Sequence, residues 1–385
     1  MVNQLPKGWK EEELGKHANI KRGSTITKKQ VVHGDYPVVA GGKEAAYYHN
    51  EYNRQPPVIT VSGSGASAGY VNYWEVPIFA SDCCTIEEKD LNIKYIYYFL
   101  KSRQQELLDK QVGVAIPHVS PKDVSPLLIP YPTDKGEQKY IVDTLDAVAE
   151  MIRLRKETIQ LTKDLIPAIF QEMFGDPITN PKGWEITTLG NPDVCTLQYG
   201  YTATAQDSGD TRYIRITDIG KDGYIDNGNK AWLNYDNKME DYKLYHKDIL
   251  VARTGASYGK TLLYNNDTDA IFASFLIRII FNKKKIIPEF YWAYSLTDSY
   301  WQQANRLVSG VAQPQFNGSA LKQILLMLPP WPLQEKFAKK VEQINKYIVA
   351  QQEELEHFET LFQSLLQEAF TGILTWKYPR KENND

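Results

Sequence analysis

A glycine-rich segment in the second half of the chain has the composition of a phosphate-binding loop. Residues 253–261 read Arg-Thr-Gly-Ala-Ser-Tyr-Gly-Lys-Thr and end in the Gly-Lys-Thr that closes such loops. A phosphate-binding loop needs four residues between its glycines, whereas Gly255 and Gly259 enclose three. In the first half, the similar loop 65–69 is followed by Tyr70 where the lysine would stand. The spacing therefore argues against nucleotide binding.

Other catalytic patterns are equally weak. Asp82, followed by Glu87, Glu88 and Lys89, has the residue types of a metal-dependent nuclease, in which carboxylates hold Mg²⁺ and a lysine polarises water. The pattern occurs once and at short spacing, so a surface run of charges is the simpler interpretation. The chain also lacks the Asn-Pro-Pro-Tyr turn of amino-methyltransferases and a His-Glu-x-x-His zinc pair. We therefore predict no catalytic residue and no metal site.

Composition and charge are those of a soluble globular protein. The chain has 385 residues, of which 42% are hydrophobic and 24% charged, and a net charge of −3. A polyanionic partner would therefore require basic residues gathered on one face. The three cysteines form no metal-type pair, which is typical of reduced thiols. No apolar run reaches the ~18 residues of a membrane span, and the start has no apolar signal segment. We expect a cytoplasmic protein without disulfides.

The sequence repeats itself. Three landmarks recur in the same order: Pro-Lys-Gly-Trp with Leu-Gly after it, Gly-Ala-Ser-x-Gly, and Gly-Val-Ala-x-Pro. They occupy residues 6–9, 65–69 and 113–117 in the first half and residues 181–184, 255–259 and 310–314 in the second. A preserved order of landmarks indicates a duplicated scaffold.

A long helix is predicted after each third landmark. The apolar residues there alternate in steps of three and four, which is a heptad pattern, and each helix would run about 35 to 40 residues. We expect the two helices to pair with each other, although two independent amphipathic helices remain the alternative. The positions expected to mediate this pairing are Ile141, Leu145, Ile152, Arg155, Ile159, Val341, Ile348, Gln351, Leu355 and Phe362.

In each predicted helix, the apolar residues of the heptad pattern form a continuous seam along one face. Both seams are interrupted by a polar residue at the same place. Arg155 and Gln351 are 196 positions apart, as are the other equivalent positions of the two seams. Antiparallel pairing would bring both near the centre, with Glu353 and Glu354 within reach of the arginine, and such an interruption fixes register. Pro167 lies inside the first helix and predicts a bend there.

The intervening segments read as mixed, β-rich domains. Short β-branched and aromatic runs alternate with glycine and asparagine turns, and residues 93–110 and 288–306 are the strongest helix candidates within them. We predict an α+β fold with a pseudo-two-fold internal repeat, in which two globular domains are separated by two long antiparallel coiled-coil helices. The predicted boundaries are domain 1 at 1–134, a central helix at 135–176, domain 2 at 177–331, a C-terminal helix at 332–376 and a polar tail at 377–385.

Two globular domains held apart suit a split, linear target such as DNA, whose groove openings recur on one face about every 34 Å. Basic residues would contact phosphates, and polar side chains would reach base edges. The candidates, most of them in predicted turns, are Lys21, Arg22, Lys43 and His118 in the first half and Arg212, Arg215, Arg253, Thr254, Ser257, Lys260, Gln313 and Gln315 in the second. His118 is the equivalent of Gln315. Solvated charges or turn caps remain the alternative for each residue, and a non-DNA scaffold with two ligand-binding domains remains the alternative for the chain.

The order of the landmarks resembles the specificity (S) subunit of type I restriction-modification systems over essentially the full chain. Residues 6–15 and 181–190 resemble the segment that opens each half of that family. Residues 136–139 (Gly-Glu-Gln-Lys) and 332–336 (Pro-Leu-Gln-Glu-Lys, with Gln and Glu exchanged) resemble the start of its long helices. The ends of the helices, 170–176 and 366–372, are similar to the family as well.

This resemblance implies a non-catalytic subunit with two target-recognition domains, each reading half of a bipartite, asymmetric DNA site. The paired helices would set the spacer and dock two modification subunits, which methylate adenine with S-adenosylmethionine. Restriction subunits that use ATP and Mg²⁺ would join the complex. The chain itself would hold no cofactor and contact no membrane.

Overall fold

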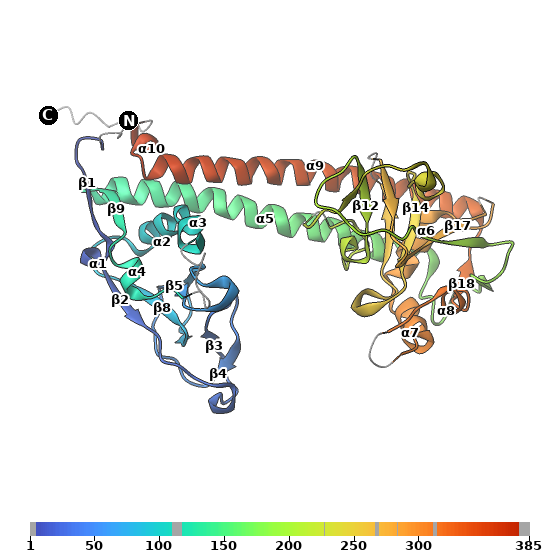
Figure 1. The fold of residues 1–385 in the computed structure, drawn as a ribbon, viewed down its shortest axis with the longest axis horizontal. Coiled ribbons are helices and arrows are strands. Elements are labelled where there is room, and N and C mark those ends of the chain that lie inside the picture. Colours follow the sequence, from blue (N-terminus) through green and yellow to red (C-terminus); the bar gives the residue numbers. More distant parts are fainter. Residues whose placement is uncertain are drawn as a thin grey trace. The chain divides into compact units, whose positions relative to one another are not determined.

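The computed structural model describes residues 5–109, 118–226, 228–265, 269–282, 284–310 and 314–376 (Figure 1). The chain forms two compact units. Unit 1 contains residues 1–156 and 353–385, and unit 2 contains residues 157–352. Each unit combines one globular domain with about half of each of the two long helices.

The described residues of the globular domain of unit 1 form three small sheets. Strands β2-β8-β5-β6 form an antiparallel sheet, β4-β3-β7 form a mixed sheet, and β1 pairs with β9. The strands are β1 Trp9–Glu13, β2 Ala18–Arg22, β3 Tyr36–Val39, β4 Tyr47–His49, β5 Val58–Ser62, β6 Val71–Trp74, β7 Phe79–Ala80, β8 Cys83–Glu88 and β9 Leu128–Pro132. The helices are α1 Leu14–His17, α2 Ile93–Ser102, α3 Gln104–Asp109 and α4 Pro121–Val124, with 3-10 turns η1 Lys28–Gln30 and η2 Gly65–Ser67.

Unit 2 has the same topology. Its sheets are β11-β17-β14-β15, β13-β12-β16 and β10-β18. The strands are β10 Glu185–Thr188, β11 Cys195–Tyr199, β12 Thr211–Ile214, β13 Trp232–Leu233, β14 Asp248–Ala252, β15 Thr261–Tyr264, β16 Ala270–Phe272, β17 Leu276–Phe281 and β18 Leu325–Leu328. The helices are α6 Pro288–Ser295, α7 Asp298–Leu307 and α8 Gly318–Leu321, with 3-10 turns η3 Ile216–Asp218, η4 Asn237–Tyr242 and η5 Gly255–Ser257. The matching sheets confirm the predicted duplication and the α+β fold.

The two long helices are α5 and α9. Helix α5 spans Lys135–Phe174, with 40 residues, and α9 spans Trp331–Ala369, with 39. Helix α5 continues through Pro167, and Gly175 follows its end in the left-handed conformation that favours glycine. After α9 the left-handed Gly372 separates a short helix, α10 Ile373–Trp376. The predicted C-terminal helix at 332–376 is therefore two helices.

The two helices predicted inside the globular domains are each divided as well. The region 93–110 forms α2 and α3, which are separated at Arg103, and Lys110 lies outside the described residues. The region 288–306 forms α6 and α7, because the side chain of Thr297 accepts from the backbone N–H of Tyr300 and starts a new helix.

A buried glutamine fixes the start of each long helix. Gln138 donates from Nε2 to the carbonyl of Pro132 at 2.9 Å. Gln334, at the equivalent position, donates to the carbonyls of Pro329 and Lys285 at 2.9 and 3.0 Å. Both side chains are buried, so these bonds satisfy polar groups that would otherwise be costly to bury. The repeated Gln of the helix-start motif is thus explained by packing.

Aromatic rings join the helices to each domain. In unit 1, Phe370, which directly follows α9, contacts Tyr95 and Phe99 of α2, with ring centroids 5.2 and 5.6 Å apart. In unit 2, Phe174 at the end of α5 contacts Phe290 of α6 at 4.8 Å. Positions 174 and 370 are equivalent in the repeat, so each domain is anchored by the same contact.

Candidate nucleic-acid interface

The repeated Gly-Ala-Ser-x-Gly segments form equivalent turns between two paired strands. Gly65 and Gly69 link β5 to β6, and Gly255 and Gly259 link β14 to β15. All four glycines have positive φ, between 68° and 87°, which explains why glycine recurs at these positions. Each turn closes by the N–H of its second glycine, which donates at 2.8 Å to the preceding strand.

The residue that follows the Gly-Val-Ala-x-Pro landmark forms a bridge with the residue that precedes the glycine turn in each domain. His118 forms an antiparallel bridge with Ser64, and Gln315 forms one with Thr254. The bridges confirm that His118 and Gln315 are equivalent, as the sequence predicted.

Strand register extends this equivalence to further side chains. The N–H of Gly63 donates to the carbonyl of Asp82 at 2.9 Å, and the N–H of Arg253 donates to the carbonyl of Phe275 at 3.0 Å. The backbone is therefore the same in both domains, whereas the side chains differ. The equivalent positions, which we call the loop-face positions, are Arg22, Gly63, Ser64, Asp82 and His118 in unit 1 and Tyr199, Arg253, Thr254, Phe275 and Gln315 in unit 2.

Arg253 lies between two exposed aromatic rings. Its guanidinium carbon is 5.3 Å from the ring centroid of Tyr199 and 5.6 Å from that of Phe275. Its Nε donates to the carbonyl of Ser274 at 2.9 Å, and the hydroxyl of Tyr199 accepts from the N–H of Gly318 at 3.0 Å. Tyr199 is 46% exposed and Phe275 is 50% exposed. We call Arg253, Tyr199 and Phe275 the arginine platform.

Three other predicted residues of unit 2 lie at or near the surface. Lys260 is half-buried, and its Nζ donates to the carbonyl of Ile219 at 3.3 Å. Arg215 is half-buried and donates to the carbonyl of Asn229 at 2.7 Å. Ser257 lies half-buried in the 3-10 turn η5. Lys260 and Arg215 thus donate hydrogen bonds to backbone carbonyls, and both side chains remain partly exposed.

Arg212 and Thr254 were predicted to contact DNA, but both side chains are buried and have structural roles instead. Arg212 is only 5% exposed, because its side chain turns into the domain and its Nη2 lies 3.2 Å from the carboxylate of Asp218. Thr254 is also buried, and its hydroxyl accepts from Nε2 of Gln315 at 2.8 Å. Gln315 itself is half-buried. Gln313 lies outside the described residues.

In unit 1 two lysines flank one aromatic ring. Nζ of Lys43 is 5.4 Å from the ring centroid of Tyr70, and Nζ of Lys101 is 4.9 Å from it. The pKa of Lys101 is lowered, first by burial and then by the charge of Lys43. Lys21 is exposed but pairs with Glu87 at 3.0 Å.

The remaining candidates of unit 1, Arg22 and His118, are exposed. Sequence reasoning missed Tyr199, Phe275 and Lys101, because only the pairing of distant strands and helices places them beside a predicted residue.

The nuclease-like run of charges is structural. Asp82 accepts a hydrogen bond from the hydroxyl of Ser64. Glu87 pairs with Lys21, and Lys89 donates to the carbonyl of Lys16 at 2.8 Å. Within the ranges that the structure describes, no group of three or more His, Cys, Asp or Glu residues could hold a metal ion.

The cysteines give a direct test of this packing. All three are buried, and burial raises the pKa of Cys83 and Cys84 to about 12 and of Cys195 to about 11. The thiols should therefore stay neutral at pH 8, where a free thiol near its usual pKa of ~8.5 reacts readily. We expect no labelling by a thiol-specific disulfide reagent at pH 8 until denaturant is added. Labelling of one thiol per native chain would contradict the packing around it.

The predicted seam of the long helices is buried within each unit. In unit 1 the first half of α5 packs with the last part of α9, and in unit 2 the last part of α5 packs with the first half of α9. The seam residues Ile141, Leu145, Ile159, Val341 and Ile348 are buried, and Ile152, Leu355 and Phe362 are half-buried. Arg155 pairs with Glu354 at 2.6 Å, so Glu354 lies within reach of the arginine as predicted. Gln351 belongs to unit 2 and is half-buried.

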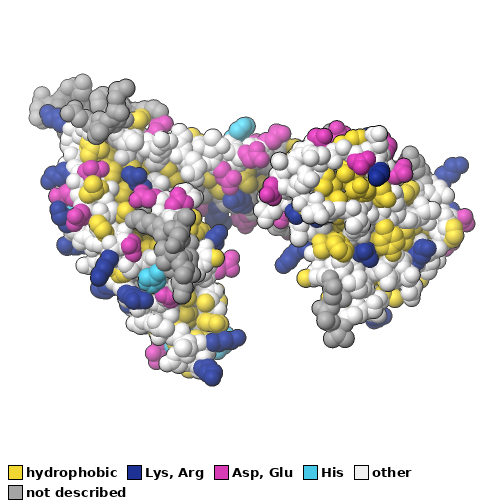
Figure 2. Space-filling view, viewed as in Figure 1, with side chains coloured by type: hydrophobic (Ala, Val, Ile, Leu, Met, Phe, Trp, Pro, Cys, Tyr) yellow, Lys and Arg dark blue, Asp and Glu magenta, His cyan; other side chains and the backbone are white. Residues whose placement is uncertain are grey.

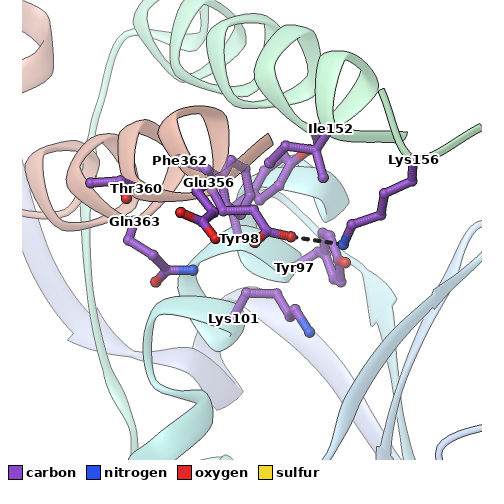
Figure 3. A pocket seen from close by; sticks show the side chains of 11 residues that line it. Tyr97, Tyr98, Lys101, Ile152, Lys156, Glu356, Thr360, Phe362 and Gln363 are labelled. Atoms are coloured by element: carbon purple, nitrogen blue, oxygen red, sulfur yellow. Dashed lines mark ion pairs between the residues drawn. The ribbon is translucent and has the colours of Figure 1, made fainter. Parts of the chain in front are cut away.

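A groove lies beside the helices in unit 1, between α2, α5 and α9 (Figure 3). It has a volume of about 890 Å³, and Lys156 and Glu359 form an ion pair of 2.8 Å in its lining. Unit 2 has an equivalent groove of about 490 Å³. Adding 196 to the numbers of the α5 residues that line it gives the α9 residues that line the groove of unit 1. The chemistry differs, since Tyr97 and Lys101 correspond to Trp292 and Leu296. Both grooves are therefore explained as products of the repeated fold.

Charge on the visible face is mixed. Figure 2 shows Lys and Arg side chains spread over this face of each domain, with Asp and Glu side chains among them. On this face, DNA contact would thus depend on single Lys and Arg side chains and not on a continuous basic patch. Within the described residues, no helix is long and apolar enough to span a membrane.

The comparisons with known proteins agree with this architecture. Residues 6–163 and 181–359 match the family model described as type I restriction modification DNA specificity domain. The StySPI specificity subunit of a type I restriction enzyme from Salmonella potsdam is 25% identical, with 99% of this chain and 92% of that protein covered. The MjaVIII specificity subunit from Methanocaldococcus jannaschii is 21% identical, with 97% and 95% covered.

Two solved structures have a similar fold. The S subunit of a type I restriction-modification system from M. genitalium has a TM-score of 0.59 and 19% identity, covering 96% of this chain and 97% of that chain. A chain from a structure describing complex assembly and conformational transition of the type I system has a TM-score of 0.53 and 18% identity, covering 96% and 99%.

Proposed function

Because the chain belongs to the family of type I restriction-modification DNA specificity domains, we propose that it selects the DNA sequence on which a type I restriction-modification complex acts. Each globular domain reads one half of a bipartite, asymmetric site, and the paired helices α5 and α9 set the spacer between the halves. The observation that carries this proposal is the pair of domains with one topology and different side chains at the loop-face positions. A repeated scaffold with divergent surfaces suits two different half-sites.

The chemistry of the complex is assigned to other subunits. The curated relatives are named as specificity subunits of restriction enzymes, which supports a chain that selects the site without cutting or methylating it. We propose that the helices dock two modification subunits, which use S-adenosylmethionine to methylate adenine, and that restriction subunits using ATP and Mg²⁺ join them. The complex would act in the cytoplasm. The partners would also contribute phosphate contacts, which fits a net charge of −3 on this chain.

Methylome sequencing tests the proposal. A host would express this chain together with its candidate modification subunit, and the control host would express the modification subunit alone. We expect a new split motif with adenine methylation only when both are present, because this chain supplies the sequence reading. If the two proteins co-purify and no new motif arises, the chain does not select a DNA site.

Binding of the purified complex to duplex DNA gives a second readout of the same proposal. Affinity for the motif should exceed that for a scrambled duplex and should fall steeply with salt, because counterions are released when cations meet phosphates. Equal affinity for both duplexes would contradict sequence selection.

A further inference from the structure

We infer that the arginine platform determines specificity in the second domain, where Arg253 reads the acceptor pair of a guanine in the major groove. This inference rests on the proposed function and names the chemistry of one contact. Arg253 is the residue that recognises the base, whereas Tyr199 and Phe275 position it.

Hydrogen bonds of the backbone and of Nε fix Arg253 and leave its two terminal nitrogens available. The N–H of Arg253 donates to Phe275, its carbonyl accepts from the N–H of Phe316 at 2.7 Å, and its Nε is bound to Ser274. Neither terminal nitrogen has a hydrogen-bond or ion-pair partner among the residues that the structure describes. Those two nitrogens form a planar pair of donors, which matches N7 and O6 of guanine. The backbone and Nε contacts limit the entropy lost on binding.

The aromatic rings are placed as lateral supports. Tyr199 is fixed through its hydroxyl by Gly318, and Phe275 precedes β17, whose pairing with β14 places it beside Arg253. A ring whose only role was to fill the core would be buried, whereas both rings are about half exposed. Their exposed faces and edges are available to sugars and to the methyl group of thymine beside the guanine.

The position of Arg253 carries a different residue in unit 1. Gly63 stands where unit 2 has Arg253, and its backbone forms the equivalent bonds, with Asp82 and with Val119. The donor of unit 2 therefore has no counterpart in unit 1, where the equivalent of Phe275 is an acceptor, Asp82. A role in holding the turn together would be needed in both domains. The difference in side chains on the same backbone is what reading two different half-sites requires.

The test uses the full complex with the modification subunit and three variants. Arg253→Lys keeps the charge but loses the paired donors, Phe275→Ala removes one support, and Lys238→Ala removes an exposed charge elsewhere in the same domain as the control. Methylation rates would be measured on duplexes that carry the motif and each single-base replacement in either half-site.

We expect Arg253→Lys to lower discrimination at one G·C pair of the second half-site by about ten- to hundredfold. Phe275→Ala should lower it less at the same pair, and the first half-site should be read unchanged, which also shows that the complex is folded. Lys238→Ala should resemble the unmodified chain.

Two results would overturn the inference. Retained discrimination at every position of the second half-site would show that Arg253 does not read a base. A uniform loss of affinity with an unchanged motif would assign Arg253 to a phosphate instead. Failure of the proposed function looks different, since the unmodified chain would then yield no motif at all.

Discussion

Replacing Phe174 by alanine is expected to lower the free energy of unfolding of unit 2 by about 3–5 kcal/mol, the usual cost of a large buried aromatic side chain. Phe174 is fully buried, and its ring centroid lies 5.0 Å from that of Phe170, 4.8 Å from Phe290 and 5.3 Å from Phe337. The ring thus joins α5, α6 and α9, and its loss leaves a cavity that these three helices cannot close without moving.

Urea unfolding followed by tryptophan fluorescence would measure this effect. Unit 2 contains five of the eight tryptophans, among them Trp184 and Trp292. Its transition would be fitted separately from that of unit 1, because a chain of two units need not unfold in one step. The matched control is Leu165→Ala on the same helix, where the side chain is 50% exposed and a change within about 0.5 kcal/mol is expected. If both variants shifted the midpoint equally, the ring cluster would not be the anchor of the helices on this domain.

The long helices could be predicted because their signals are local. The heptad steps and the polar interruption at Arg155 lie within one continuous segment, and that register placed Glu354 within reach of Arg155. The division of the region 288–306 also had a local signal, since Thr297 followed by Asp298 is typical of a helix start. The prediction of one helix over this region did not use that signal.

The candidate interface could be predicted only in part, because strand pairing is not local. Arg253 was found from the repeated glycine turn, but the rings beside it come from β11 and from the residue before β17, far away in sequence. Arg212 was misplaced for the same reason. It lies in β12, where Asp218 and two backbone carbonyls hold its side chain inside the domain, and sequence alone did not show which way that side chain points.

Inserting one helical turn into both long helices is expected to lengthen the spacer of the recognised site while leaving both half-sites unchanged. The insertions would be four residues between Lys156 and Glu157 in α5 and four between Gln352 and Glu353 in α9. Four residues add about 6 Å along a helix, which corresponds to at most about two base pairs at the ~3.4 Å spacing along one strand of DNA. Coiled coils accommodate such an insertion by local unwinding, so the paired helices should remain paired.

The control inserts the same four residues into α5 alone. One helix would then be a turn longer than its partner, so the apolar residues of the two helices would face each other on one side of the insertion only. Methylation should therefore be lost or strongly reduced. Methylome sequencing of hosts carrying the single and the double insertion distinguishes the outcomes. A double insertion that methylates the original motif with its original spacer would show that helix length does not set the distance between half-sites. A motif one or two base pairs longer would show that the two globular domains read DNA at a separation fixed by the helices.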